Sequence, residues 1–326
     1  MRLGSFCTGY GGLDMAVEAH YGAHLAWCSE VDKDCNQLLA HHWPGVPNLG
    51  DLTKVDWDQV EPVDIMCAGF PCQPFSHAGK RLGGDDERAI FAYIADAVGV
   101  LRPGIVVLEN VAGLLTLGGP GVVGTLTGLG YDCRWGVVRA SDAGAPHRRA
   151  RWFCIARNTD DGQQGQVGTV QTQEPEHGGT GDAATNAEVV HGEHGGQAVE
   201  DPGCIQVQPR GDDRSAADPE GAERRTAEHE TVGEAVGSAA EPRERTSATT
   251  WGHFGAAVTR WERVLGRPAP DPTDAGKLSS RFVEWIMGLP DGHVCDLGMS
   301  RTAELKMLGN GVVPAQAALA LTVLDE

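Results

Sequence analysis

The feature that most constrains this chain is an apolar run at residues 63–68 that stops abruptly at a glycine and two prolines. The run reads VDIMCA and is typical of a buried strand. Gly69, Pro71 and Pro74 then exclude a regular element and restrict the backbone. Cys72 therefore stands on a stiff corner at the carboxyl end of a strand, where open α/β sheets bind ligands. A buried structural thiol is the alternative, but the flanking prolines favour a nucleophile held on a rigid loop.

A strand, a glycine turn and a helix follow one another at the amino terminus. A short strand at residues 3–7 leads into TGYGG at 8–12, and apolar residues then recur at helical spacing. This order is used to cradle nucleotide-like ligands. Glu30 ends the next expected strand about 20 positions after the glycines, where an acid can bind ribose hydroxyls. Asp51 follows a third expected strand; the alternative for Glu30 is a solvated carboxylate at a helix start.

Charged residues also follow the later expected strands. Residues 105–108 read IVVL and end in Glu109, one helix after the cysteine strand, so the two strands should be sheet neighbours. A partly desolvated Glu109 could act as a general acid, and a helix-capping carboxylate is the alternative. Strands are also expected at 131–138 and 152–156. Arg149 and Arg151 should share a strand face, where paired guanidiniums bind anionic or carbonyl oxygens.

Charge and composition divide the chain. The net charge is −19, but residues 158–250 hold 19 acidic residues against 6 arginines, which leaves only −6 for the rest. This stretch has no Leu, Met, Phe, Tyr or Trp, so it cannot bury enough apolar surface to fold alone. We expect a disordered acidic insertion at 158–250. Arg260, Arg263 and Arg267 form a basic edge on an expected helix after it, and GNGVVP at 309–314 opens a C-terminal helix.

Cellular location can be predicted from what the sequence lacks. No apolar run reaches the length of a membrane span, and the start has no signal-peptide profile. Nine cysteines without a C-x-x-C pair favour neither disulfides nor a zinc ribbon, and the histidines lack metal-ligand spacing. The sequence thus predicts a reduced cytoplasmic protein without a metal site or a membrane partner.

Six motifs in this order resemble the DNA cytosine-C5 methyltransferases. They are TGYGG at 8–12, Glu30, Asp51, GFPCQPFS at 69–76, ENV with HRRAR at 109–111 and 147–151, and GNGVVP at 309–314. The resemblance implies an α/β fold with a Rossmann-like S-adenosylmethionine-dependent domain, a small second domain and a long low-complexity insertion. It divides the chain into a catalytic core at 1–157, the insertion, a target-recognition domain at 251–308 and a returning segment at 309–326.

The same resemblance implies which residues bind the cofactor, the DNA and the base. The expected S-adenosylmethionine site comprises Gly9, Tyr10, Gly11, Gly12, Glu30, Val31, Asp51, Leu52, Pro71, Asn310 and Val312. The expected DNA contacts comprise Gln73, Ser76, Lys80, Arg81, Arg260 and Arg263. The expected catalytic residues are Cys72, Glu109, Arg149 and Arg151.

Residues 79–86 are glycine-hinged and charged, and we expect them to form a lid; an ordinary surface loop is the alternative.

The implied mechanism is covalent. Cys72 adds to C6 of a cytosine flipped out of double-stranded DNA, Glu109 engages N3, Arg151 holds O2 and Arg149 contacts phosphate. The chain departs from the family at Cys7, where an aromatic is usual, at His147, where a glutamine is usual, and in its small recognition region. A monomer with a cognate restriction endonuclease is expected. An RNA cytosine-C5 methyltransferase and a non-catalytic binding module remain the alternatives.

Overall fold

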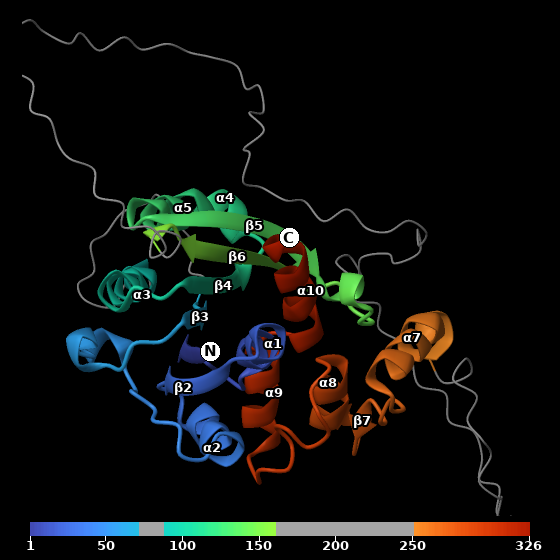
Figure 1. Cartoon of the computed structure of the whole chain (residues 1–326). Coiled ribbons are helices and arrows are strands. Elements are labelled where there is room, and N and C mark those ends of the chain that lie inside the picture. Colours follow the sequence, from blue (N-terminus) through green and yellow to red (C-terminus); the bar gives the residue numbers. More distant parts are fainter. Residues whose placement is uncertain (72–87, 161–250) are drawn as a thin grey trace, which may run out of the picture.

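The structure is a computed structural model that describes residues 1–71, 88–160 and 251–326. Its centre is a six-stranded sheet in the order β2-β1-β3-β4-β6-β5 (Figure 1). The strands are β1 (Arg2–Phe6), β2 (His24–Ser29), β3 (Ile65–Gly69), β4 (Ile105–Val111), β5 (Tyr131–Arg139) and β6 (Ala150–Asn158). The first four are parallel, whereas β6 runs antiparallel to both β4 and β5.

The parallel strands bring their carboxyl ends to one edge of the sheet. β3 pairs with β4 so that Gly69 lies opposite Glu109, which confirms the predicted neighbourhood of the two strands. β1 lies between β2 and β3, so the glycine turn that follows Phe6 opens at the same edge. Ligand sites form at this edge because loops from several strands converge there.

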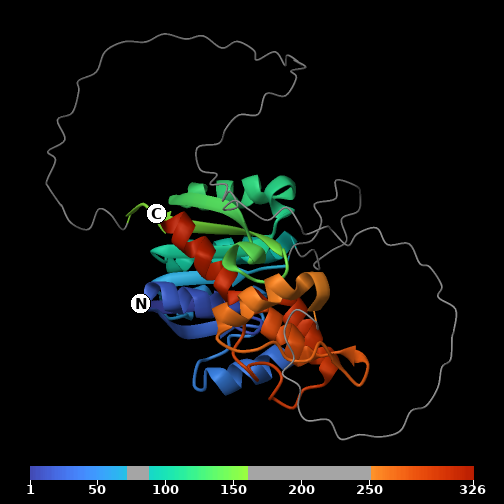
Figure 2. The same cartoon turned by 90° about the vertical axis from the view of Figure 1, so that its right-hand side faces the viewer.

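Helices cover both faces of the sheet (Figures 1 and 2). They are α1 (Gly12–Tyr21), α2 (Lys33–His42), α3 (Arg88–Leu101), α4 (Leu114–Leu117), α5 (Gly119–Gly128) and α10 (Pro314–Asp325), with short helices η1 (Leu52–Lys54), η2 (Trp57–Gln59) and η3 (Ala140–Ala143). The alternation of strand side chains assigns the faces: Ile65 and Cys67 pack with α1 and α10, and Met66 and Ala68 pack with α3 and α5.

The C-terminal third packs beside α1 and α10 and shares their hydrophobic core. It comprises η5 (Gly252–Phe254), α7 (Gly255–Leu265), the hairpin β7 (Thr273–Asp274) and β8 (Lys277–Leu278), α8 (Ser280–Ile286) and α9 (Arg301–Asn310). Trp261 and Trp285 are fully buried, and the Trp261 indole donates to the Trp285 carbonyl at 3.0 Å. Buried Glu284 accepts backbone N–H groups of Gly292, Val294 and Cys295, which fixes the turn after α8.

Residues 301–325 are the one stretch of the described chain long and apolar enough to cross a membrane. The helix is interrupted, however, because α9 ends at Asn310 and α10 begins at Pro314. Ala317, Leu321 and Leu324 of α10 are buried in the core beside α1. Such core helices pass the same composition test as membrane spans, and the packing accounts for the apolar composition.

Two local predictions are wrong. No third strand precedes Asp51 within residues 43–50, where Asn48 makes only an isolated bridge to Cys28. Arg149 lies one residue before β6 with φ 35°, so it does not share a strand face with Arg151. Residues 161–250 of the predicted insertion lie outside the described residues.

Candidate active site

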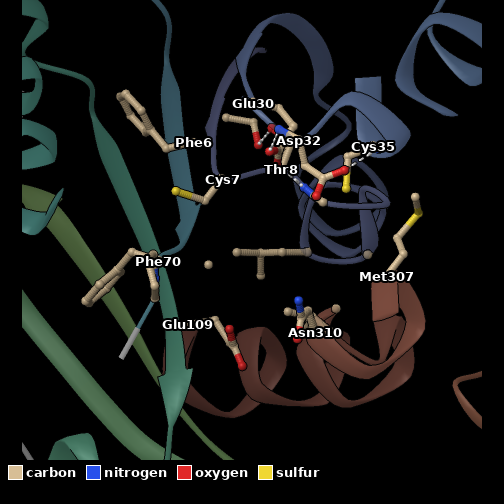
Figure 3. A pocket seen from close by; sticks show the side chains of 18 of the residues that line it. Phe6, Cys7, Thr8, Glu30, Asp32, Cys35, Phe70, Glu109, Met307 and Asn310 are labelled. Atoms are coloured by element: carbon tan, nitrogen blue, oxygen red, sulfur yellow. Dashed lines mark hydrogen bonds between the residues drawn. The ribbon is translucent and has the colours of Figure 1, made fainter. Parts of the chain in front are cut away.

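A cavity of about 450 Å³ lies at the carboxyl edge of the parallel strands. It lies between the ends of β1 to β4 and the segment that joins α9 to α10 (Figure 3). Eight residues predicted from sequence line it: Gly9, Gly12, Glu30, Pro71, Glu109, Arg151, Asn310 and Val312. Figure 3 shows Glu30 and Glu109 on opposite sides of this space. The volume lies in the range of small-molecule sites, about 300–1,000 Å³.

Glu30 ties the glycine turn to the second strand. Its Oε2 accepts the backbone N–H of Gly9 at 2.9 Å, and its Oε1 accepts those of Val31 and Asp32, each at 2.8 Å. Oε1 of Glu30 therefore binds the backbone just before a helix, as the alternative interpretation expects. The same side chain also lines the cavity. Asp32 is the N-cap of α2.

The turn itself requires glycine for two different reasons. Gly9 and Gly11 have φ of 60° and 80°, which side chains disfavour. Gly12 has a different constraint, because a Cβ there would lie 2.3 Å from the carbonyl oxygen of Val312. The first turn of α1 and the C-terminal segment are thus in backbone contact.

Tyr10 stabilises this contact. Its ring is fully buried, its hydroxyl donates to the Val312 carbonyl at 2.6 Å, and it does not line the cavity. A Cβ on Gly311 would lie 1.8 Å from Tyr10 Cε1, so this backbone passes directly over the ring. Tyr10 therefore supports the wall of the cavity instead of touching its contents.

Arg149 holds the same segment from the other side. Its Nη2 donates to the carbonyl oxygens of Gly309 at 2.8 Å and Gly311 at 2.6 Å. The sequence predicts that Arg149 contacts phosphate. In the structure its guanidinium is half-buried and donates to backbone oxygens. One guanidinium nitrogen thus donates to both glycine carbonyls.

Glu109 and Arg151 form an ion pair on the opposite wall. Arg151 Nε lies 3.0 Å from Glu109 Oε1, and the carboxylate side chain is only 9% exposed. Burial raises the pKa of Glu109 to about 7, and the opposing effects of Arg151 and Arg149 are smaller. A carboxyl with this pKa is substantially protonated near neutrality, which equips it to donate a proton.

His147 precedes these arginines and is neutral. Burial, and then Arg149 and Arg151, lower the pKa of His147 to about 4. Neither of its ring nitrogens has a hydrogen-bond partner in the described structure. His147 therefore adds no positive charge to the arginines at neutral pH.

Several predicted cofactor residues do not line the cavity. Gly11 and Leu52 are outside it, and Leu52 is buried in the core on the α3 face. Val31 is 69% exposed and does not line the cavity. Asp51 accepts from Thr53 and pairs with Lys54 at 2.7 Å, so its carboxylate faces its own short helix.

The predicted DNA contacts divide between described and other residues. On α7, Arg263 is exposed, and its Nε donates to the Thr259 carbonyl at 3.3 Å. Arg260 donates to the Gly144 carbonyl at 3.2 Å. The predicted nucleophile Cys72 lies outside the described residues, as do Gln73, Ser76, Lys80 and Arg81.

Several charged cavity residues were not predicted from the sequence. Lys306 of α9 donates to Asp32 at 2.6 Å, both residues line the cavity, and this bond lowers the pKa of Asp32. Asp14 of α1 also lines the cavity. Asp32 could have been predicted as a structural residue, because an aspartate just before a helix is a typical N-cap. Nothing in the sequence links Lys306 to a residue 274 positions away.

A glycine turn, a strand-end carboxylate and a cavity at the carboxyl edge of the parallel strands are typical of an α/β protein that binds a nucleotide-like cofactor. The family model described as C-5 cytosine-specific DNA methylase matches residues 1–322, and the chain belongs to this family. It is 34% identical over 155 residues to the Type II methyltransferase M.DsaV of Dactylococcopsis salina, covering 45% of this chain and 43% of that protein. It is also 34% identical over 155 residues to the Type II methyltransferase M.MspI of Moraxella sp, covering 46% of this chain and 37% of that protein. The chain therefore spans less than half of either relative.

The fold is also shared with a solved structure. The S. pombe Dnmt2 methyltransferase is 15% identical, with a TM-score of 0.57 over 100% of both chains. This likeness shows a Rossmann-like methyltransferase fold, in agreement with the fold predicted from sequence.

The role of Arg149 can be tested by Arg149→Met. Loss of the hydrogen bonds to the Gly309 and Gly311 carbonyls should lower the free energy of unfolding by about 1–3 kcal/mol, the range for a lost buried hydrogen bond. Urea unfolding measures this, with the exposed change Arg134→Met on β5 as the control. Unchanged stability together with a salt slope of DNA binding reduced by about 1 would instead identify a phosphate contact.

Proposed function

We propose that this protein transfers a methyl group from S-adenosylmethionine to C5 of cytosine in double-stranded DNA. The observation that carries the proposal is the Glu109–Arg151 pair, which faces the cavity wall formed by Glu30 and the glycine turn. One wall thus offers groups for a pyrimidine and the other offers groups for a nucleoside cofactor. Membership of the C-5 cytosine-specific DNA methylase family supports the same reaction.

The cavity fits S-adenosylmethionine in size and in chemistry. Glu30 offers carboxylate oxygens to ribose hydroxyls, and the backbone of Gly9, Gly12, Asn310 and Val312 encloses the rest. Gly12 lacks room for a Cβ, so the glycine turn stays in direct contact with the Val312 backbone at the cavity wall. When bound, the cofactor supplies an activated methyl group.

Glu109 and Arg151 are suited to a cytosine ring. N3 and O2 of cytosine are both hydrogen-bond acceptors, and the pair offers one proton on a carboxyl and several on a guanidinium. A pKa near 7 keeps part of Glu109 protonated, so it can donate to N3 while Arg151 donates to O2. Both interactions draw electron density from the ring and favour addition at C6.

Cys72 completes the proposal, and its role rests on the sequence. Its thiolate would add to C6 of the flipped base, and the electron pair would move to C5. C5 would then take the methyl group as the S–CH₃ bond of the cofactor breaks, with the sulfur leaving as a neutral thioether. A base then removes the C5 proton, the C5–C6 double bond re-forms and Cys72 leaves as thiolate. Flipping is required because C6 cannot be reached inside the base stack.

The wider setting forms part of the same proposal. We place the enzyme in the cytoplasm as a monomer acting on DNA, with a cognate restriction endonuclease as a partner. The described cysteines are all free thiols, as expected in a reducing compartment. RNA as the substrate and binding without catalysis are the alternatives. A carboxyl with a pKa near 7 favours catalysis, because binding alone does not require a proton donor.

The covalent step predicts an adduct with DNA that contains 5-fluorocytosine. With S-adenosylmethionine present, the wild-type protein should form a complex that survives denaturing electrophoresis, because fluorine at C5 blocks release. Cys72→Ala should form none, and Cys154→Ala, a buried change in β6 outside the cavity, should still form it. An adduct formed by Cys72→Ala would reject the nucleophile assignment.

Glu109→Gln tests the proton donor. The variant should bind S-adenosylmethionine normally but lose roughly 10²–10⁴-fold in the single-turnover methylation rate, as expected for a lost general acid. In the wild type, the contribution of protonated Glu109 should decline as the pH rises through about 7, and the variant should lack this decline. The exposed change Asp58→Asn is the control. Lost cofactor affinity with the rate unchanged would make Glu109 a cofactor ligand.

A further inference from the structure

Asp14 is a buried carboxyl that the proposed mechanism does not use. It lies in the first turn of α1, is 1% exposed and lines the cavity. Its Oδ1 accepts from Cys67 Sγ at 3.6 Å, and it is hydrogen-bonded to the Ser5 hydroxyl. No ion pair joins Asp14 to a cationic side chain of residues 1–71, 88–160 or 251–326. Burial without a counter-ion is costly for a carboxylate.

The strand register places Asp14 between the two walls of the cavity. Cys67 and Gly69 are two residues apart on β3, so they face the same side of the sheet about 7 Å apart. Cys67 contacts Asp14, and a Cβ on Gly69 would lie 3.4 Å from Glu109 Oε2. Asp14 thus lies one strand step deeper than Glu109, next to the glycine turn, which Glu30 binds from its far side.

This position would face the methionine portion of the cofactor. With the ribose at Glu30 and the methyl group facing Glu109, the methionine portion would extend toward the first turn of α1, and it carries an ammonium group. An ammonium both neutralises a carboxylate and donates hydrogen bonds to it, whereas a sulfonium offers charge alone. We propose that Asp14 binds the ammonium group of the methionine portion of S-adenosylmethionine, an assignment that rests on the proposed function.

The groups around Asp14 make this binding dependent on pH. Burial, and to a smaller extent Glu18 on the same helix, raises the pKa of Asp14 to about 6, and the hydrogen bonds from Ser5 and Cys67 oppose this. Cys67 on β3 and Cys28 on β2 also face it, and burial keeps both thiols protonated by raising their pKa. Asp14 is therefore neutral below about pH 6, and affinity for a cation should fall there.

The test is Asp14→Asn, measured by calorimetric binding of S-adenosylmethionine and S-adenosylhomocysteine from pH 5 to 8. Both ligands keep the ammonium group, so the variant should bind each roughly 10- to 100-fold more weakly at pH 7.5, as expected for a lost charged hydrogen bond. Its affinity should also lack the decline below pH 6. Glu18→Gln makes the same charge change one turn along α1, outside the cavity, and should bind normally.

Stability separates a ligand contact from a structural role. A raised pKa means that folding disfavours charged Asp14, so Asp14→Asn should unfold at the same or a higher urea concentration at pH 7.5. Weaker binding by a protein of undiminished stability supports the proposal. Weakened binding of S-adenosylmethionine alone would assign the sulfonium instead, and unchanged binding of both ligands would overturn the proposal. Failure of the wild-type protein to bind either ligand would reject the proposed function itself.

Discussion

The contact between the glycine turn and the C-terminal segment is the constraint on which the cavity depends. Gly12 and the Val312 carbonyl approach so closely that no Cβ fits between them, and Gly311 crosses the ring of Tyr10. The Tyr10 hydroxyl and the Arg149 guanidinium supply the hydrogen bonds that hold the segment in place. Residues about 300 positions apart thus form one wall, and this close approach requires a glycine at position 12 near one end of the chain and at position 311 near the other.

A second constraint is electrostatic. The cavity is lined by carboxyls whose surroundings differ, and these differences separate their roles. Glu30 is bound to backbone N–H groups, Asp32 is paired with Lys306, and burial raises the pKa of both Asp14 and Glu109. Glu30 and Asp32 thus hold the walls, and the raised pKa values of Asp14 and Glu109 allow both carboxyls to exchange protons near neutral pH.

Much of this architecture could be predicted because it follows local patterns. The adjacency of β3 and β4, the glycine turn and the start of α10 at Pro314 come from apolar runs and from glycine and proline positions. The failures involve tertiary context. The loop before Asp51 is apolar enough for a strand, yet only Asn48 bridges to Cys28 there, and Asp51 pairs with Lys54. Arg149 has its partners about 160 residues away, and no local pattern encodes them.

We propose that the two walls of the cavity together direct a methyl group to C5 of cytosine. The most direct measurement is mass spectrometry of nucleosides from double-stranded DNA incubated with the protein and S-adenosylmethionine carrying a labelled methyl group. Transfer to C5 predicts label in 5-methyl-deoxycytidine. Label in N6-methyl-deoxyadenosine or in N4-methyl-deoxycytidine, or label only in a parallel RNA reaction, would contradict it.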